Sequence, residues 1–392
     1  DPGSIHIYVL AFANASVLLL HETWYYQFIN GHQWLLWSQE GMVDKVLAVN
    51  STYVLVFTLC YLILIKLFKI DQHVNKLNKF RYPLNNFIII YLSTLLISIF
   101  LDLLSLNYFD AYWSQITQLA YLISAAALVS KIKNDYIVFA ICFLYMCFII
   151  FISSPLLSST ENYVINRGGA VATVLFVIVF IDVTQQRNLL SRKRVNLFLL
   201  FLPILLGTSN YIEAYINGSP DSFYQLVIYM LEGYEVRMME NQAIIINTIE
   251  TNQMYGLGNT YLFAFIDLIF PLQNLNLSPT VWLSSYLTGG VDAKGQFGFS
   301  TIAEGLMNFP VYGAVVAALI NAFILFLLRN LLHKNRYYGP ILFTVLFVLP
   351  YYLYRSDFNY VLKKAEFAIL STIAVLILLK IIGLLNLATK RS

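Results

Sequence analysis

Residues 46–65 read VLAVNSTYVLVFTLCYLILI, a run of twenty residues that contains no charged side chain. A helix needs about 20 apolar residues to cross the hydrocarbon core of a membrane, so this run predicts one spanning helix. Similar runs recur along the whole chain and predict about ten spans rather than a single anchor. The predicted spans are residues 5–21, 46–65, 84–103, 113–130, 136–154, 169–184, 195–211, 309–328, 338–354 and 365–385.

The composition excludes a soluble protein. The chain has 392 residues, of which 59% are hydrophobic and only 11% are charged, whereas soluble domains carry about 25% charged residues. The net charge of +3 also argues against a nucleic-acid partner, because proteins that bind nucleic acids usually present a strongly basic surface. We therefore predict an all-α, polytopic membrane protein.

Cysteine chemistry and metal binding are not indicated by the sequence. Cys60, Cys142 and Cys147 all lie in apolar stretches, as buried small side chains usually do. No His-Glu-x-x-His sequence or similar ligand spacing occurs, so we expect no metal and no cofactor. Residues 1–4, DPGS, read as the remnant of an expression tag.

Lysine and arginine residues indicate the side of the membrane on which each loop lies, because they concentrate in cytoplasmic loops. With the N-terminus inside, sixteen of the 24 Lys and Arg residues fall in inner loops and seven on the outer side. The distribution predicts that both termini are cytoplasmic. The inner loops are all short, which disfavours a nucleotide-binding domain and an ATP-driven pump.

One long segment, residues 212–308, is predicted to lie outside the membrane on the face opposite the cytoplasm. It separates an N-terminal bundle of about seven spans over 5–211 from a C-terminal membrane segment of about three spans over 309–392. The segment is acidic and carries only two cations, Arg237 and Lys294.

Several short elements are expected within this external segment. Residues 222–232 and 259–272 are apolar but too short and too interrupted to span, so we expect helices at the membrane surface. Residues 234–251 read as a mixed helix, and the four glycines of 288–298 predict a mobile loop.

Arg237 is the first candidate for chemistry, because arginine binds phosphate through a planar, bidentate fork. Glu240 and Asn241 follow three and four positions later, so all three can share one helix face. The alternative is a local Arg–Glu pair on a solvated helix.

Glu304 and Asn308 are four residues apart and are expected to stack on one face of a helix. A partly desolvated carboxylate at the outer membrane boundary has a raised pKa and suits a general base. The alternative is a capping box formed by Thr301 and Glu304, which would satisfy backbone N–H groups at the start of the helix.

Arg355, Asp357, Lys363 and Lys364 gather on the outer side, where few cations are expected. They predict an anion site, and the alternative is a set of snorkelling side chains without a ligand. His21 ends the first span on the same side and is either a base near neutral pH or a polar cap.

Three segments resemble the Wzy-type O-antigen and oligosaccharide repeat-unit polymerases of bacteria. They are GNTYLFAFIDLIFP at 258–271, GFSTIAEGLMNFPVYG at 298–313, and Arg355 with Asp357. The first is similar to the family's Gly-x-x-Tyr followed by an apolar run and Pro, and contains Tyr261. The second is similar to its Ser-x-x-x-Glu and Asn-Phe-Gly pattern, although Pro310 stands where the family usually has Gly. The long outer loop late in the chain fits the family as well.

The resemblance implies a membrane glycosyltransferase of polysaccharide and lipopolysaccharide biosynthesis in the bacterial cytoplasmic membrane. Its donor and acceptor would be oligosaccharide units linked to a polyprenyl (undecaprenyl) pyrophosphate carrier on the outer leaflet, and polyprenyl pyrophosphate would be released. A chain-length regulator, a flippase and membrane lipids are the implied partners. The alternatives are an O-antigen ligase and, in a different class, a glycolipid flippase or transporter.

The resemblance also implies roles for the candidate residues. Arg237 and Arg355 would bind the pyrophosphate and stabilise the leaving group, and Glu304 would be the base. The other expected catalytic residues are Asp357 and His21. Substrate contacts are expected from Glu240, Asn241, Asn308, Tyr261, Lys363 and Lys364.

Overall fold

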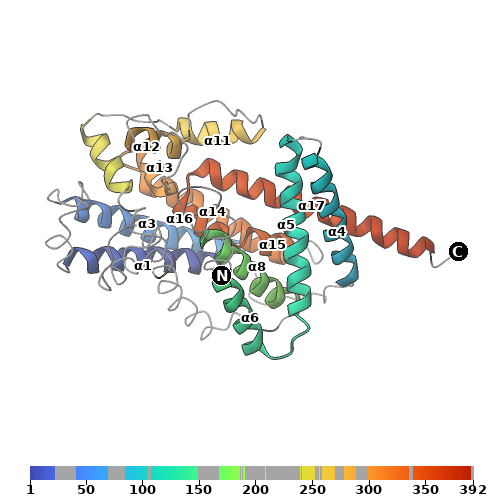
Figure 1. Cartoon of the computed structure of the whole chain (residues 1–392). Helices are drawn as coiled ribbons and strands as arrows, with labels where there is room; N and C mark the ends of the chain where they lie inside the picture. The colour runs from blue at the N-terminus through green and yellow to red at the C-terminus, as the bar shows by residue number, and fades with distance from the viewer. Residues whose placement is uncertain are drawn as a thin grey trace.

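The structure, a computed structural model, describes residues 1–22, 41–68, 84–103, 107–148, 167–185, 187, 189, 208, 239, 241–251, 256, 258–269, 278–287, 299–334 and 339–389. Within these ranges the chain is helical and contains no strand (Figure 1), which confirms the all-α prediction for this part. The helices are α1 (Pro2–Glu22), α3 (Met42–Leu67), α4 (Leu84–Leu103), α5 (Asn107–Val129), α6 (Asp135–Phe148), α8 (Arg167–Gln185), α11 (Asn259–Ile269), α12 (Pro279–Leu287), α13 (Thr301–Asn308), α14 (Gly313–Lys334), α15 (Gly339–Leu346), α16 (Leu349–Arg355) and α17 (Phe358–Thr389).

The helices coincide with the predicted spans wherever the structure describes them. Each of α1, α3, α4, α5, α6, α8, α14 and α17 overlaps one predicted span. The predicted span 195–211 lies outside the described residues apart from Thr208. Three helical segments are long and apolar enough to cross a membrane: Met42–Leu67, Gly313–Leu331 and Phe358–Ile382. These three support a membrane protein, whereas the number ten stays a prediction.

The predicted span 338–354 is broken in the structure. α15 ends at Leu346, and α16 begins at Leu349 with Pro350 in its first turn. Proline lacks a backbone N–H and its ring crowds the preceding turn, so it fits the start of a helix and not the interior. The break therefore follows from Pro350.

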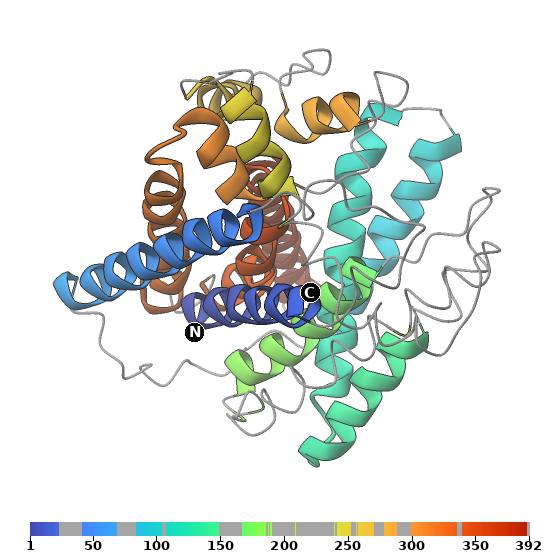
Figure 2. The ribbon, with the colours of Figure 1, turned by 90° about the vertical axis from the view of Figure 1, so that its left-hand side faces the viewer.

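The described core consists of two main parts (Figure 2). In one, α1, α3, the helix over 241–251, α13, α14 and α16 pack together; in the other, α4, α5, α6, α8 and α15 pack together with the middle of α17. α4 and α5 lie side by side and stand across α17 in Figure 1, and α17 carries the chain to its C-terminus.

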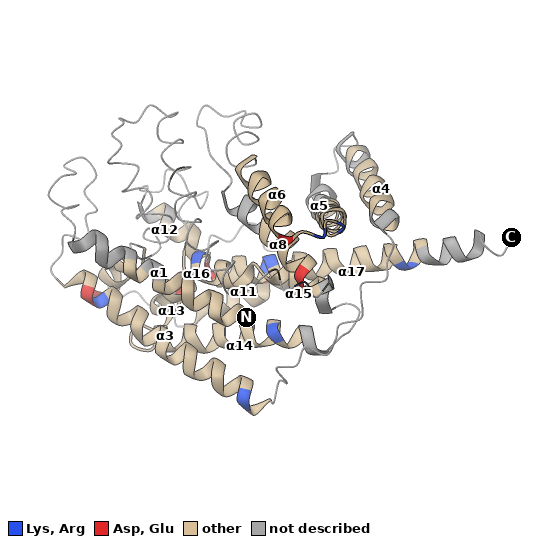
Figure 3. Ribbon diagram, turned by 90° about the horizontal axis from the view of Figure 1, so that it is seen from below, with Lys and Arg blue, Asp and Glu red and all other residues tan. Residues whose placement is uncertain are grey.

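Many outward-facing side chains are apolar, as expected for contact with lipid. On α3, Leu55, Leu59 and Leu62 are more than half exposed, while Tyr53 and Phe57 on the opposite face are fully buried. Charged residues are few and tend to lie near helix ends, as at the two ends of α3 (Figure 3).

The segment 212–308, which is predicted to be external, contains a helix in the range expected for a surface helix and one helix that the pattern did not predict. α11 lies within the predicted 259–272, and residues 241–251 form the described part of the mixed helix. α12 was not predicted. The predicted elements at 222–232 and 288–298 lie outside the described residues. α11 and α12 lie at the upper end of the molecule in Figures 1 and 2.

Residues 1–4, which read as a tag remnant in the sequence, lie against the protein. α1 begins at Pro2, and the Asp1 carboxylate pairs with Arg329 at 2.7 Å and accepts a hydrogen bond of 2.6 Å from Tyr61. Gly3 is required at this contact, because a Cβ there would lie 2.3 Å from the Tyr61 ring.

Candidate functional site

α13 carries the two polar residues that the sequence places on one face, Glu304 and Asn308. The helix begins after Ser300, whose hydroxyl accepts a hydrogen bond of 3.1 Å from the Ala303 N–H. Ser300 is therefore the N-cap, and Thr301 instead donates to the Leu353 carbonyl oxygen at 2.6 Å. The capping-box interpretation of Thr301 and Glu304 is wrong, because Thr301 already lies inside the helix.

Glu304 is fully enclosed, with an exposed fraction of 0%. One carboxylate oxygen accepts a hydrogen bond of 2.6 Å from the Thr260 hydroxyl, and the other accepts one of 2.6 Å from the Phe358 backbone N–H. Burial, followed by the negative charge of Asp357, raises the pKa of Glu304 from 4.5 to about 8, although both hydrogen bonds act in the opposite direction. Glu304 thus joins α13 to α11 and α17, and holds its proton at neutral pH.

Asn308 connects α13 to the segment that precedes α11. Its amide nitrogen donates to the Thr260 hydroxyl at 2.6 Å and to the Glu304 carbonyl oxygen at 2.8 Å. Its amide oxygen accepts a hydrogen bond of 3.0 Å from the Gly258 N–H. Two glycines are required here: Gly258 has a φ of +84°, and a Cβ on Gly256 would lie 2.5 Å from the Asn308 oxygen.

Asp357 caps the N-terminus of α17. One carboxylate oxygen accepts a hydrogen bond of 2.8 Å from the Tyr360 N–H. The other accepts hydrogen bonds from the hydroxyls of Ser278, at 2.8 Å, and Thr280. A carboxylate at this position is favourable because the first N–H groups of a helix lack partners within the helix. Asp357 thereby fastens the start of α12 to the start of α17.

The two neighbouring lysines of α17 have different environments. Lys363 forms an ion pair with Asp267 of α11, a carboxylate that is only 3% exposed and also accepts a hydrogen bond from Asn359. The Lys364 ammonium lies 5.2 Å from the centre of the Tyr360 ring. The structure thus separates two cations that the sequence placed in one anion site.

Arg355 and Tyr261 have contacts at the two neighbouring helix ends: Arg355 ends α16, and Tyr261 of α11 contacts Phe358 at the start of α17. Arg355 donates a hydrogen bond to the Tyr351 hydroxyl and lies 5.5 Å from the centre of that ring. Tyr261 is buried, with its ring 5.3 Å from that of Phe358, and its hydroxyl finds no hydrogen-bond partner among the described residues. Burial, and next the negative charge of Glu304, raises the pKa of Tyr261.

Other predicted site residues fall partly or wholly outside the described residues. Arg237 and Glu240 are not described, and neither is the side chain of His21, although its backbone belongs to the last turn of α1. Asn241 is buried at the start of the helix over 241–251. The structure therefore brings together Glu304, Asn308, Tyr261 and Asp357.

A second buried polar network was missed by the sequence analysis. His6 of α1 lies 2.6 Å from the Tyr53 hydroxyl, through Nε2, and 2.8 Å from the Pro350 carbonyl oxygen, through Nδ1. The Asn321 amide nitrogen donates to the Tyr53 and Thr301 hydroxyls, each at 2.7 Å. The sequence offered one signal for this network: polar side chains such as His6 and Asn321 stand inside predicted spans. Such side chains are costly in a membrane unless they form hydrogen bonds with one another.

The site as a whole contains a protonatable carboxyl, a network of hydroxyl and amide groups, and cations near its edge. Within the described ranges, no group of three or more His, Cys, Asp or Glu residues could hold a metal ion. Such an arrangement can exchange one proton at Glu304 and bind polar or anionic groups near α17. No family model, curated protein or solved structure matches the chain in comparisons with known proteins.

Proposed function

We propose that the protein is a membrane glycosyltransferase that joins polyprenyl-pyrophosphate-linked oligosaccharide units on the outer face of a bacterial cytoplasmic membrane. The observation that carries the proposal is the convergence of the three segments that resemble the Wzy-type polymerases. The Glu304 carboxylate, in the second segment, accepts a hydrogen bond from the Thr260 hydroxyl of the first segment. It also accepts one from the backbone N–H of Phe358, the residue that follows Asp357 of the third segment. Thr260 and Phe358, which are 44 and 54 positions away from Glu304 in the sequence, thus both contact its carboxylate.

The ion pairs of the described residues support the proposed sidedness. Each of the four joins two charges that the Lys and Arg distribution assigns to the same side of the membrane. The outer pairs are Lys45–Glu250 and Lys363–Asp267, and the inner pairs are Arg187–Asp135 and Arg329–Asp1.

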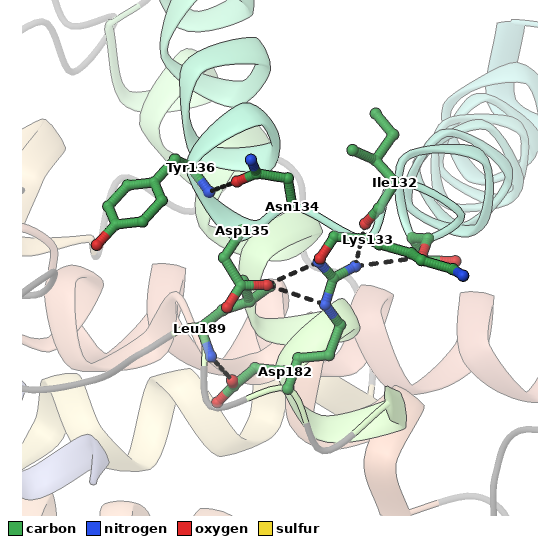
Figure 4. Close-up of polar contacts among 9 residues, drawn as sticks. Ile132, Lys133, Asn134, Asp135, Tyr136, Asp182 and Leu189 are labelled. Carbon is green, nitrogen blue, oxygen red and sulfur yellow. Dashed lines mark hydrogen bonds and ion pairs between the residues drawn. The ribbon is translucent and has the colours of Figure 1, made fainter.

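The contact between two predicted inner loops is especially extensive (Figure 4). Arg187 follows α8 and donates to the Asp135 carboxylate and to the carbonyl oxygens of Ser130, Ile132 and Lys133, at the turn between α5 and α6. A cation at the C-terminal end of a helix is favourable because the last carbonyl groups lack partners within the helix. Arg187, which follows α8, therefore lies against the turn between α5 and α6. Such direct contact is expected only if both loops lie on the same side of the membrane.

These contacts support the finer topology that we propose: about ten spans, both termini cytoplasmic, and residues 212–308 outside. Among the described residues of that segment, α13 packs against α14 and α16, and α11 packs against α17, near the ends at which a lipid-linked substrate would arrive. The acidic, aromatic character of the segment suits sugar recognition.

In the proposed reaction, the acceptor hydroxyl attacks the anomeric carbon of the donor, and its proton passes to the ionised form of Glu304, which is the minor form at neutral pH while the carboxyl is enclosed. The bond between that carbon and the pyrophosphate breaks, and polyprenyl pyrophosphate leaves with the electron pair. Arg355 and Arg237 would stabilise the leaving group, while Asn308 and Glu240 orient the site. A base with a pKa of about 8 is well matched to a neutral medium. Because Glu304 is enclosed, the proposal requires α11 to move away from α13 when substrate binds.

The test is reconstitution of the purified protein in vesicles with polyprenyl-pyrophosphate-linked repeat units. We expect a ladder of glycans that differ by one unit, together with release of polyprenyl pyrophosphate. Transfer only to a lipid A core acceptor would favour the ligase instead, and movement of the labelled lipid between leaflets without a new glycosidic bond would favour the flippase. Absence of all three would refute a role in glycan assembly.

Within a cell, the same three functions differ in the surface glycan of a strain that lacks the protein. A polymerase-deficient strain retains single repeat units and loses longer chains. A strain without ligase or flippase loses all surface glycan.

A further inference from the structure

A cavity of about 380 Å³ lies where α5, α8, α15, α16 and α17 meet. Ligand pockets commonly measure about 300–1,000 Å³, so this cavity can hold a headgroup or a sugar ring but not a whole lipid. Aromatic and aliphatic side chains form much of its wall, among them Phe176, Phe347 and Phe367. Gln118, Thr344 and Ser371 add hydrogen-bonding groups.

The wall contributed by α16 and α17 contains a row of tyrosines with a cation at each end. The Tyr351 and Tyr352 rings lie 5.9 Å apart, and those of Tyr352 and Tyr360 lie 5.6 Å apart. Arg355 contacts the Tyr351 end of the row, and Lys364 contacts the Tyr360 end. Tyr352, Tyr360 and Lys364 line the cavity itself.

Lys364 is the cation of this cavity. It lies in the helical segment Phe358–Ile382, which is apolar enough to span a membrane, and no carboxylate of the described residues forms an ion pair with it. Its neighbour Lys363 differs, because the Asp267 carboxylate already compensates that charge. A lysine at the end of a spanning helix reaches the headgroup level, where anionic groups can pair with it. The unmatched charge of Lys364 therefore favours an anionic ligand.

The cavity also has an open side. Tyr360 is 42% exposed, and Gln118 on α5 is exposed as well. Both side chains border the cavity near the outer ends of the predicted spans, where the proposed topology places the lipid headgroups. An apolar tail attached to a bound headgroup can leave the cavity there and enter the bilayer.

We infer that this cavity binds the phosphate-ester headgroup of a lipid, with Lys364 on the phosphate and Tyr352 and Tyr360 beside the adjoining group. The inference names the place where the lipid carrier would bind, and rests on the proposed function only for the identity of that carrier. Two sources share this chemistry: a polyprenyl carrier and an ordinary membrane phospholipid. The experiment distinguishes them.

The test measures binding of farnesyl pyrophosphate to the purified full-length protein in nanodiscs of phosphatidylcholine, without a sugar acceptor. Lys364→Met should weaken binding about tenfold, since it removes a charge-assisted contact. Lys364→Arg keeps the charge and should stay within about threefold of the original protein. Lys380→Met is the matched control, because it removes a lysine of the same helix that lies sixteen residues from Lys364 and outside the cavity lining, and it should leave affinity unchanged.

A second variant tests the same cavity in case Lys364→Met does not fold correctly. Ala368→Phe fills the cavity and should abolish binding while the thermal midpoint stays close to that of the original protein. Unchanged affinity in both Lys364→Met and Ala368→Phe would overturn the inference. Equal affinity for inorganic pyrophosphate would also overturn it, because a headgroup site must gain from the attached lipid.

Nanodiscs that contain phosphatidylglycerol identify the source. Competition by this phospholipid at low mole fraction would support a membrane-lipid site, and lack of competition would support a polyprenyl carrier. The binding assay contains no acceptor and is therefore independent of polymerisation. A protein that binds farnesyl pyrophosphate here but forms no glycan in the reconstitution with lipid-linked repeat units would sink the proposed function alone. Polymerisation that survives Lys364→Met and Ala368→Phe would sink the cavity assignment alone.

Discussion

The backbone N–H of Phe358 donates a hydrogen bond of 2.6 Å to the carboxylate of Glu304, which is fully buried. Because the pKa of Glu304 is about 8 in the folded protein against 4.5 ordinarily, the folded state binds this proton more tightly than the unfolded chain. The resulting stabilisation is complete below about pH 4.5 and is lost as the pH rises to about 8.

Glu304→Gln should remove this pH dependence, since a neutral amide can accept from Phe358 and donate to Thr260. Between pH 6 and pH 8 the original protein should lose about 2 kcal/mol relative to the variant. Thermal unfolding of both proteins in detergent across this range measures the difference. Parallel curves would contradict a raised pKa. If Glu304 is the base, the same variant also loses glycan synthesis at every pH.

Gly305 and Gly313 lie where α13 and α14 cross, and neither position has room for a side chain. A Cβ on Gly313 would lie 2.3 Å from backbone atoms of Gly305, which cannot move aside as a flexible side chain could. Gly313→Ala should therefore destabilise the protein by about 1–3 kcal/mol. Leu319→Ala, on the exposed face of α14, is the control. A thermal midpoint that drops no further for Gly313→Ala than for the control would refute the close approach.

Asp357 should matter for stability through the contacts of its two oxygens. Asp357→Ala removes both the cap of α17 and the attachment of α12, at a cost of about 2–3 kcal/mol. Asp357→Asn retains an oxygen for the Tyr360 N–H and should cost about 1 kcal/mol. Chemical denaturation of the two variants provides the comparison. An Asn variant with normal stability and no glycan synthesis would indicate a direct role in the reaction instead.

The pair of Lys363 and Asp267 should behave as a structural unit. Lys363→Met leaves a carboxylate that is 3% exposed without its cation, and should cost about 2 kcal/mol, less than a fully buried pair because Lys363 is 39% exposed. The double variant with Asp267→Asn should recover most of that loss. A double-mutant cycle by thermal unfolding tests the coupling, and additive effects would show that the pair contributes nothing.

The proposed sidedness can be read by labelling single cysteines in a background without Cys60, Cys142 and Cys147. A membrane-impermeant maleimide should label a cysteine at position 45 or 250 in intact cells, because those residues form an exposed pair that the proposed topology places outside. It should label position 131 only after permeabilisation. The reverse pattern would invert the topology.

The helices were predictable where the cause is local. Apolar runs of sufficient length became helices, and the four-residue spacing of Glu304 and Asn308 did place them on one face, since the Asn308 amide donates to the Glu304 carbonyl. The break before Pro350 has a local cause as well, although the apolar run concealed it.

The site was less predictable because its contacts join distant segments. Thr260 and Phe358 meet at Glu304 only because α11 and α17 pack beside α13, and no periodicity in the sequence encodes that packing. Lys363 and Lys364 illustrate the same limit. Successive residues on a helix point about 100° apart, so one reaches Asp267 and the other reaches the cavity, and the difference depends on how α17 is rotated.

The hydrogen bond between His6 and the Pro350 carbonyl oxygen can form only late in synthesis. The two residues are 344 positions apart, so at about 5–20 residues per second the ribosome needs roughly 20–70 s to produce the partner of a ring made at the start. Throughout that time Nδ1 of His6 lacks this partner, whereas Nε2 can already contact the Tyr53 hydroxyl, 47 positions away. The contact between α1 and α16 is therefore among the last to form, and a chain that ends before Pro350 would leave one nitrogen of a buried ring without its partner.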